Sequence, residues 1–145
     1  MNFKKPVSEI MRRHVLTIKR NFSFSEACRL FFRMGIHHLP VVDDDNHLYG
    51  MLSTHDALRA FALRGHLLKN WDEENVDWSF PVEELMTQPA ICIQENDTME
   101  EVIRLYNEHH IQSLPVLQDG KLIGMVTSHD IMQFLADSKI SNQPA

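Results

Sequence analysis

The hydrophobic positions of this chain recur with two different spacings. Ala27, Leu30 and Phe31 occupy positions i, i+3 and i+4, the spacing expected for the buried face of a helix. Val102 and Leu105 repeat that spacing farther along the chain. Four shorter apolar runs have the length of β-strands and are joined in pairs by turn-forming residues. These runs are Leu39–Asp43 with Leu48–Ser53, and Leu114–Leu117 with Leu122–Thr127.

Polar residues mark where the helices begin and end. Ser23 with Glu26, and Thr98 with Glu101, have the spacing of a capping box, in which side chains satisfy the first backbone amides of a helix. Gly35 supplies a helix stop. Each half is predicted to run strand, helix, strand, strand, helix, which gives an α/β (α+β) fold. The first strands are expected at Val15–Ile18 and Ala90–Ile93, and the second helices from Thr54 and Ser128.

The two halves are copies of one pattern. Val7-Ser-Glu-Ile-Met11 matches Val82-Glu-Glu-Leu-Met86, and the same register aligns Leu39-Pro40-Val41 with Leu114-Pro115-Val116. One residue is lost in the following turn, after which His55-Asp56 aligns with His129-Asp130. Because each copy leaves one sheet face uncovered, we expect two pseudo-symmetric repeats packed sheet to sheet. The predicted parts are 1–64 (repeat 1 with the N-terminal segment), 65–81 (linker), 82–137 (repeat 2) and 138–145 (C-terminal tail).

The linker is polar and acidic but contains two tryptophans, Trp71 and Trp78. We predict that their large apolar rings hold the linker against the body of the protein. A contact with a partner or with a second copy is the alternative.

Composition narrows the class of protein. A net charge of −6 argues against binding to nucleic acid or to an anionic membrane surface, because both need clustered Lys and Arg. No uncharged apolar run is long enough to span a bilayer, and no apolar stretch follows the N-terminal lysines as a signal peptide requires. Cys28 and Cys92 are expected to be reduced thiols rather than a disulfide. We therefore expect a cytoplasmic protein.

The string Leu-Pro-Val … Gly-x-x-Thr/Ser-x-x-Asp, preceded by Met11 or Met86 and present twice, resembles the CBS domain, named for cystathionine β-synthase. A tandem pair of such domains is called a Bateman module. The resemblance extends from Val7 to about Leu135. It implies a disc-like body with clefts between the repeats that bind AMP, ADP, ATP or, less often, S-adenosylmethionine. It also implies a regulatory role toward a partner protein, and a homodimer.

Each repeat carries a hydroxyl and a carboxylate where a strand meets a helix: Ser53 with Asp56, and Thr127 with Asp130. A helix N-terminus presents unpaired amides that suit a phosphate, and a carboxylate one turn later can accept hydrogen bonds from a ribose diol. The resemblance implies these roles. A simple helix cap gives the same spacing, but its duplication in two matching repeats favours ligand binding.

The resemblance places the adenine against the first strand and the Leu-Pro edge of each repeat, where backbone atoms make the contacts. Ordinary strand core is the alternative. The matching positions are Val15, Leu16, His38 and Pro40 in the first repeat, and Ala90, Ile91, Ser113 and Pro115 in the second.

The two copies are not equivalent. The family often has threonine after the methionine; Thr87 keeps it, whereas Arg12 replaces it in the first copy. Arg12 either supplies charge to a phosphate or is a solvated surface arginine. We therefore rank the second copy, with Thr87, above the first as the ligand site. His55 and His129 are expected to assist phosphate binding, and the shortage of other cations there favours AMP or ADP over ATP.

Other chemistry finds little support. The adjacent pairs His37-His38 and His109-His110 cannot point in one direction, and no spacing typical of a metal site occurs. If a metal were bound, His55 and His129 would be the best pair. No Gly-x-Ser-x-Gly motif or phosphate-binding P-loop is present, so we predict no metal ligand and no catalytic residue.

Three functions remain distinct. The leading hypothesis is a regulatory module, not an enzyme, that binds an adenine nucleotide as a regulatory ligand, needs no cofactor, and signals to an unidentified protein. The alternative is a ligand-independent dimerisation or interaction module. The third is a small enzyme acting on nucleotides, with His55 or His129 as its base. A homodimer face is expected at Leu58, Phe61, Ala62, Met132 and Leu135, for which intramolecular core is an equal alternative.

Overall fold

The computed structural model describes residues 2–140 and divides into two compact units. Unit 1 joins the N-terminal segment, up to Val15, to the part of the chain from Ile91 onward. Unit 2 is the continuous segment Leu16–Ala90. The packing units are therefore cut at different places from the sequence repeats, because the opening turn of each repeat packs with the later elements of the other one.

Unit 2 is a two-stranded sheet with helices packed on one face. Strands β1 and β2 are antiparallel, and Leu39 faces Leu52 across the pair. Those two residues and Val41 form a core with Phe24 and Phe31 of the first helix. The elements are α1 (Phe24–Met34), β1 (His38–Val42), β2 (Leu48–Ser53), α2 (Thr54–Arg64), η2 (Gly65–Leu67), α3 (Glu73–Ser79) and α4 (Val82–Leu85).

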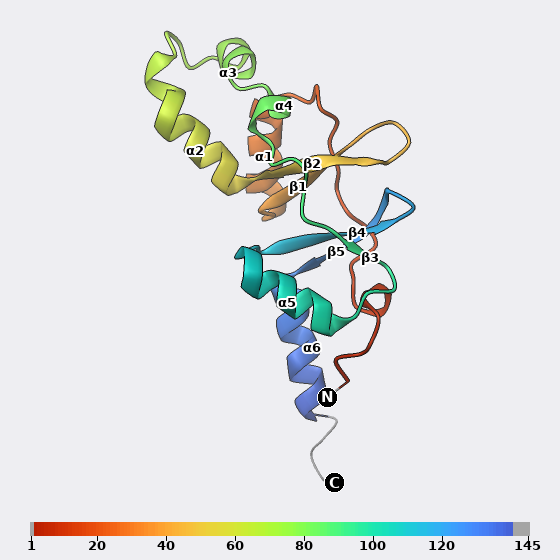
Figure 1. The fold of residues 1–145 in the computed structure, drawn as a ribbon. Helices are drawn as coiled ribbons and strands as arrows, with labels where there is room; N and C mark the ends of the chain where they lie inside the picture. Colours follow the sequence, from red (N-terminus) through yellow and green to blue (C-terminus); the bar gives the residue numbers. More distant parts are fainter. Residues whose placement is uncertain (1, 141–145) are drawn as a thin grey trace. The chain divides into compact units, whose positions relative to one another are not determined.

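Unit 1 has a three-stranded sheet in the order β3-β4-β5, in which β3 is parallel to β4 and β4 is antiparallel to β5. Figure 1 shows α5 and α6 on one side of the β4–β5 pair. The core on that side includes Leu114, Val116 and Val126, with Val7 from the N-terminal segment. The elements are η1 (Val7–Glu9), β3 (Ile93–Gln94), α5 (Met99–His109), β4 (Ser113–Gln118), β5 (Lys121–Thr127) and α6 (Ser128–Ile140).

A short crossing segment extends each sheet. Arg12 pairs with Met125 through two backbone hydrogen bonds of 2.9 Å, and Thr87 pairs with Met51 in the same way at 2.8 and 3.0 Å. The chains approach so closely that only glycine fits beside them. A Cβ at Gly124 would lie 2.8 Å from the Arg12 carbonyl oxygen, and one at Gly50 would lie 2.6 Å from that of Thr87.

Gly124→Ala is expected to destabilise the protein by about 2 kcal/mol, because the new methyl group must push the Met11–Arg12 backbone away from β5. Thermal melting measures the loss, and Lys121→Ala on the exposed end of the same strand is the control, with little expected change. Equal melting temperatures for Gly124→Ala and the wild type would show that the crossing segment is not held where we describe it.

The predicted N-caps and helix stop are confirmed, whereas Glu26 and Glu101, the second members of the predicted capping boxes, bind Arg29 and Arg104. Ser23 and Thr98 accept hydrogen bonds from the backbone amides three residues later, and Gly35 ends α1 with a left-handed φ of 61°. The turn between β4 and β5 has φ values of 51° and 78° at Asp119 and Gly120, the geometry of a tight hairpin turn. The α/β (α+β) fold class predicted from the pattern is the one observed.

The first strand of each repeat is shorter than predicted. Only Ile18 of Val15–Ile18 forms a bridge, to Val41, and in the second repeat the strand is Ile93–Gln94 rather than Ala90–Ile93. Parallel pairing with the following strand therefore involves one residue in the first repeat and two in the second. The predicted tail at 138–145 begins inside α6, and its residues 141–145 lie outside the described residues.

The linker is more ordered and more buried than its composition predicts. Val76 and Phe80 enter the core of unit 2, and Asp77 accepts hydrogen bonds from the Ser25 amide and the Ser23 hydroxyl, both at 2.7 Å. Trp71 packs on Phe61 with 5.6 Å between ring centroids, as predicted, although most of the indole is exposed. The prediction was wrong for Trp78, which is 88% exposed. The anchors are therefore Val76, Asp77 and Phe80.

Among the residues that the structure describes, none of the helices is both long and apolar enough to cross a bilayer.

Candidate functional site

The strand register sorts the predicted ligand residues onto one face of each sheet. Residues directly opposite one another in an antiparallel pair project to the same side, and successive residues alternate. In unit 1, Ser113 faces Thr127, whereas Leu114 and Val126 of the next pair belong to the core. Ser113 and Thr127 therefore lie on the face opposite the core. In unit 2 the His38–Ser53 pair occupies the equivalent position.

In unit 1, a buried carboxylate organises the end of β5 and the start of α6. Asp130 is only 8% exposed, and its Oδ2 accepts hydrogen bonds from the Thr127 amide at 2.8 Å and the Thr127 hydroxyl at 2.9 Å. Its Oδ1 accepts a 2.8 Å hydrogen bond from Nε of Arg12. Arg12 reaches it because its neighbour Met125 lies two positions before Thr127 on the same face. Arg12, which stands where the resemblance expects threonine, thus forms an ion pair with Asp130, the residue predicted to bind the ribose.

A buried hydroxyl without a hydrogen-bond partner among the described residues lies across the strand pair from Thr127. Ser113 is 6% exposed, and its Oγ forms no hydrogen bond with any of the described residues. Such a group costs roughly 1–3 kcal/mol of stability, so it is unusual in a folded protein. Because Ser113 lies opposite Thr127 in the strand register, its side chain is on the same face of the sheet as the Thr127 side chain.

Unit 2 contains the same junction with different neighbours. Ser53 and Asp56 form a reciprocal capping box, with hydrogen bonds of 2.8 Å from the Ser53 amide to Asp56 and 3.0 Å from the Asp56 amide to Ser53 Oγ. Asp56 is 6% exposed. The Oδ1 atom of Asp56 is 3.4 Å from Nη2 of Arg59, a distance longer than that of an ordinary hydrogen bond. Thr87, which matches Arg12, supplies no charge.

Two side chains beside these junctions have shifted proton affinities. Burial lowers the pKa of His38, the nearby charge of His37 lowers it further, and Asp56 opposes both, so His38 is a neutral imidazole at neutral pH. Burial raises the pKa of Tyr106, and Asp130 adds to the effect. The Tyr106 hydroxyl donates to the Val126 carbonyl oxygen at 2.9 Å, next to the junction. Neither group supplies a positive charge for a phosphate.

The structure assigns each predicted ligand residue to one unit. Thr87, which was used to rank the second copy, belongs to unit 2 with Ser53 and Asp56, whereas Thr127 and Asp130 belong to unit 1. The reason is that the opening turn of each repeat pairs with the β-hairpin of the other repeat. Unit 1 holds Val15, Ile91, Ser113, Pro115, Thr127, His129 and Asp130, and unit 2 holds Leu16, His38, Pro40, Ser53, His55, Asp56, Thr87 and Ala90.

The sequence did not reveal two features of these junctions. Arg59 approaches Asp56 from the next turn of the same helix, a spacing of three residues that could have been noticed. The unpaired hydroxyl of Ser113 left no signal, because its burial depends on the folded sheet. His55 and His129 are exposed, each in the first turn of its helix.

Metal and thiol chemistry add nothing to either junction. Among the described residues, no group of three or more His, Cys, Asp or Glu side chains is arranged to hold a metal ion. Cys28 in α1 and Cys92 just before β3 are free thiols. Burial raises the pKa of both, and Asp77 contributes further at Cys28, so both stay protonated and unreactive.

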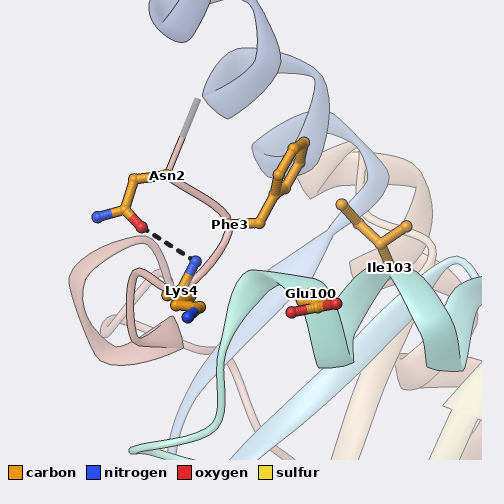
Figure 2. Close-up of a pocket in the computed structure, with 5 residues that line it drawn as sticks. All are labelled: Asn2, Phe3, Lys4, Glu100 and Ile103. Carbon is orange, nitrogen blue, oxygen red and sulfur yellow. Dashed lines mark hydrogen bonds between the residues drawn. The ribbon is translucent and has the colours of Figure 1, made fainter.

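A separate hollow of about 530 Å³ lies at the start of α5 in unit 1. Figure 2 shows its lining by Phe3, Lys4, Glu100 and Ile103, together with Asn2, whose side chain accepts a hydrogen bond from the Lys4 amide. The first two amides of α5, those of Met99 and Glu100, are not available to a ligand in this hollow, because they already donate to the carbonyl groups of Lys5 and Phe3. It contains none of the predicted ligand residues and presents no open helix N-terminus to an anion.

Ser113→Ala is expected to raise the stability of the ligand-free protein by about 1 kcal/mol, because it removes an unpaired buried hydroxyl. The melting temperature should rise by a few degrees. Ser128→Ala is the matched control: its exposed hydroxyl donates to the Gln112 carbonyl at 3.3 Å, so its removal should not stabilise the protein. A lower melting temperature for Ser113→Ala would mean that its hydroxyl has a partner.

Comparisons with known proteins agree with the duplicated architecture. The family model described as "CBS domain" matches residues 7–63 and 82–137. The chain is 30% identical over 131 residues to an uncharacterized protein of Methanocaldococcus jannaschii, MJ1225, covering 90% of this chain and 43% of that protein. The chain thus spans less than half the length of the curated relatives it matches, several of which are named homoserine O-acetyltransferase.

Two solved structures are similar over nearly their whole length. The CBS domain pair of protein MJ0100, in complex with 5′-methylthioadenosine and S-adenosyl-L-methionine, is 26% identical with a TM-score of 0.78 and covers 92% of this chain and 98% of that one. CBSX2 in complex with AMP has the same identity, TM-score and coverage. Both are similar to this chain in fold and in sequence.

Proposed function

Because the chain belongs to the CBS domain family, we propose that it is a regulatory module that binds an adenine nucleotide and signals its presence to a partner protein. One observation carries this proposal: both units contain a hydroxyl and a buried carboxylate at a strand-to-helix junction, on the sheet face opposite the core. A helix cap on the surface does not need a buried carboxylate, nor a second copy of the same arrangement.

The chemistry of the junctions fits the parts of a nucleotide. The first amides of α2 and α6, those of Thr54 and Ser128, already donate to the carbonyl groups of His37 and Gln112. The next amides, of His55 and His129, are therefore the ones proposed to donate to a phosphate, with the Ser53 hydroxyl as a further donor. Asp56 and Asp130 accept the ribose hydroxyls, and the Leu-Pro edge offers backbone groups to the adenine. Similar CBS pairs are described with AMP and with 5′-methylthioadenosine and S-adenosyl-L-methionine, which share the adenosine that these groups would recognise.

The finer assignments follow from charge and composition. Arg12 is the only guanidinium bonded to Asp130 among the described residues, so AMP or ADP is preferred to ATP. The module itself catalyses no reaction in this proposal, acts in the cytoplasm and forms a homodimer. Leu58 and Met132 are exposed apolar residues of α2 and α6, on the helices expected to line the dimer face.

A thermal-shift series tests the function. The chain is melted with AMP, ADP, ATP, S-adenosylmethionine and, as a control for bound phosphate alone, inorganic phosphate. We expect AMP and ADP to raise the melting temperature in a concentration-dependent way, since a ligand that binds only the folded state stabilises it. An unchanged melting temperature with every adenosine compound, and an unchanged oligomeric state, would instead favour a ligand-independent dimerisation or interaction module.

A further inference from the structure

Equivalent positions of the two units carry a charged residue, Arg12, in unit 1 and an uncharged one, Thr87, in unit 2. Arg12 pairs with Met125 of β5, and Thr87 pairs with Met51 of β2. Each side chain therefore lies on the ligand face. Arg12 forms a 2.8 Å ion pair with Asp130, whereas the cation that pairs with Asp56 is Arg59, at 3.4 Å, since Thr87 is uncharged. The two junctions differ in charge at the place where the phosphate and the ribose would meet.

The acceptor positions of Asp130 are almost all in use. A carboxylate has about four lone-pair positions. Two are taken on Oδ2 by the amide and hydroxyl of Thr127, and one on Oδ1 by Nε of Arg12. A ribose diol donates two hydrogen bonds, so it needs one position more than remains. Both ribose hydroxyls can bind Asp130 only if one side-chain donor, the Arg12 guanidinium or the Thr127 hydroxyl, releases it. Of these two donors, only Arg12 carries a charge that a ligand must replace.

Release of Arg12 has a different consequence for charged and neutral ligands. The side chain is 57% exposed, so it is free to turn away from Asp130. A 5′-phosphate can accept the released guanidinium in a bidentate, charge-assisted pair. A neutral 5′-group cannot, and the ligand then displaces an ion pair without replacing it.

We propose that Arg12 is a specificity-determining residue that makes the junction of Thr127 and Asp130 select adenosine ligands carrying a 5′-phosphate over those with a neutral 5′-group. This inference rests on the proposed function, since it assumes that adenosine compounds bind there. Unit 2, with Thr87, discriminates much less. The chain would then hold one site for a phosphorylated nucleotide and one that also takes an uncharged adenosyl compound.

The test compares AMP with 5′-methylthioadenosine by amide NMR, in which the Thr127 and Ser128 signals report unit 1 and those of Ser53 and Thr54 report unit 2. In the wild type, unit 1 should prefer AMP about 10-fold or more, as one charge-assisted hydrogen bond implies. Arg12→Thr, which copies Thr87, should lower that preference about 10-fold. Arg12→Gln, a second neutral variant of similar length, should do the same.

Arg13→Thr is the matched control. It removes the same charge from the neighbouring residue, whose guanidinium donates to the Ser8 carbonyl oxygen at 3.1 Å and does not bond to Asp130. The preference for AMP should survive in Arg13→Thr. If Arg12→Thr weakens both ligands equally, or leaves their ratio unchanged, Arg12 does not determine specificity. If the wild type binds neither compound, the proposed function itself fails, which is a separate result.

Discussion

Asp130→Ala is expected to weaken AMP binding by roughly 10- to 100-fold, because it removes the acceptor of both ribose hydroxyls. Hydrogen bonds to an ionised group contribute about 1.5–3 kcal/mol each, and part of that is returned as the ribose rebinds water. Isothermal titration calorimetry measures the loss. The effect should be larger than for any other single substitution at the two junctions, since Asp130 is the one buried charged acceptor among the described residues of unit 1.

Asp56→Ala is the matched comparison, because it removes the equivalent buried carboxylate from unit 2. For AMP its effect should be smaller, since Thr87 gives unit 2 no charge to hold the phosphate. The sequence also ranked the site with Asp130 above the site with Asp56, but on the basis of Thr87. The structure bases the same ranking on Arg12, which bonds to Asp130. A larger loss of AMP affinity in Asp56→Ala than in Asp130→Ala would contradict this ranking.

Phe80→Ala is expected to destabilise unit 2 by roughly 3–5 kcal/mol, as large-to-small changes of a buried aromatic residue do. Phe80 is fully buried, and its ring lies 5.6 Å from that of Phe24 and 5.2 Å from that of Phe61. It is the contact by which the linker closes the core of unit 2. Thermal melting should show a decrease on the order of 10 °C.

Trp78→Ala serves as the control from the same linker, because the 88% exposed indole should contribute within about 0.5 kcal/mol. If Phe80→Ala and Trp78→Ala melted together, the linker would not be part of the unit 2 core, and the two packing units would have to be redrawn. Retained AMP binding at unit 1 in the Phe80→Ala variant would further show that the two units can be destabilised separately.

The repeat and its helices could be predicted because they depend on local signals. Ser23, Thr98 and Gly35 act on the nearest backbone groups, so their roles are legible in the sequence. The exchange of opening turns could not be predicted in this way. It depends on contacts between residues far apart in the chain, such as Arg12 with Met125, and on the space that Gly124 leaves.

The linker shows a different limit. Large aromatic residues in a polar stretch suggested anchors, yet Trp78 is exposed and the anchors are Phe80 and the smaller Val76. Burial here is decided by which face of α3 meets α1, and Asp77 fixes that face through Ser23 and Ser25. A single polar residue therefore set the outcome that residue size alone could not.

At the candidate site, the sequence identified the hydroxyl and carboxylate of each junction and left their neighbours open. Whether Arg12 was a ligand group or a solvated side chain depended on which strand it joined, and the structure pairs it with Asp130. Ser113 was expected to contribute backbone atoms only. Its buried, unpaired hydroxyl adds a polar side chain to the same place.

The central claim is that an adenine nucleotide binds at the two buried carboxylates. Calorimetric titration of AMP into the wild type and into the Asp56→Ala/Asp130→Ala double variant tests it most directly, with thermal melting to verify that the double variant is folded. We predict saturable binding heat for the wild type and only heat of dilution for the double variant. The same binding isotherm for both proteins, or no binding heat from the wild type, would contradict the account.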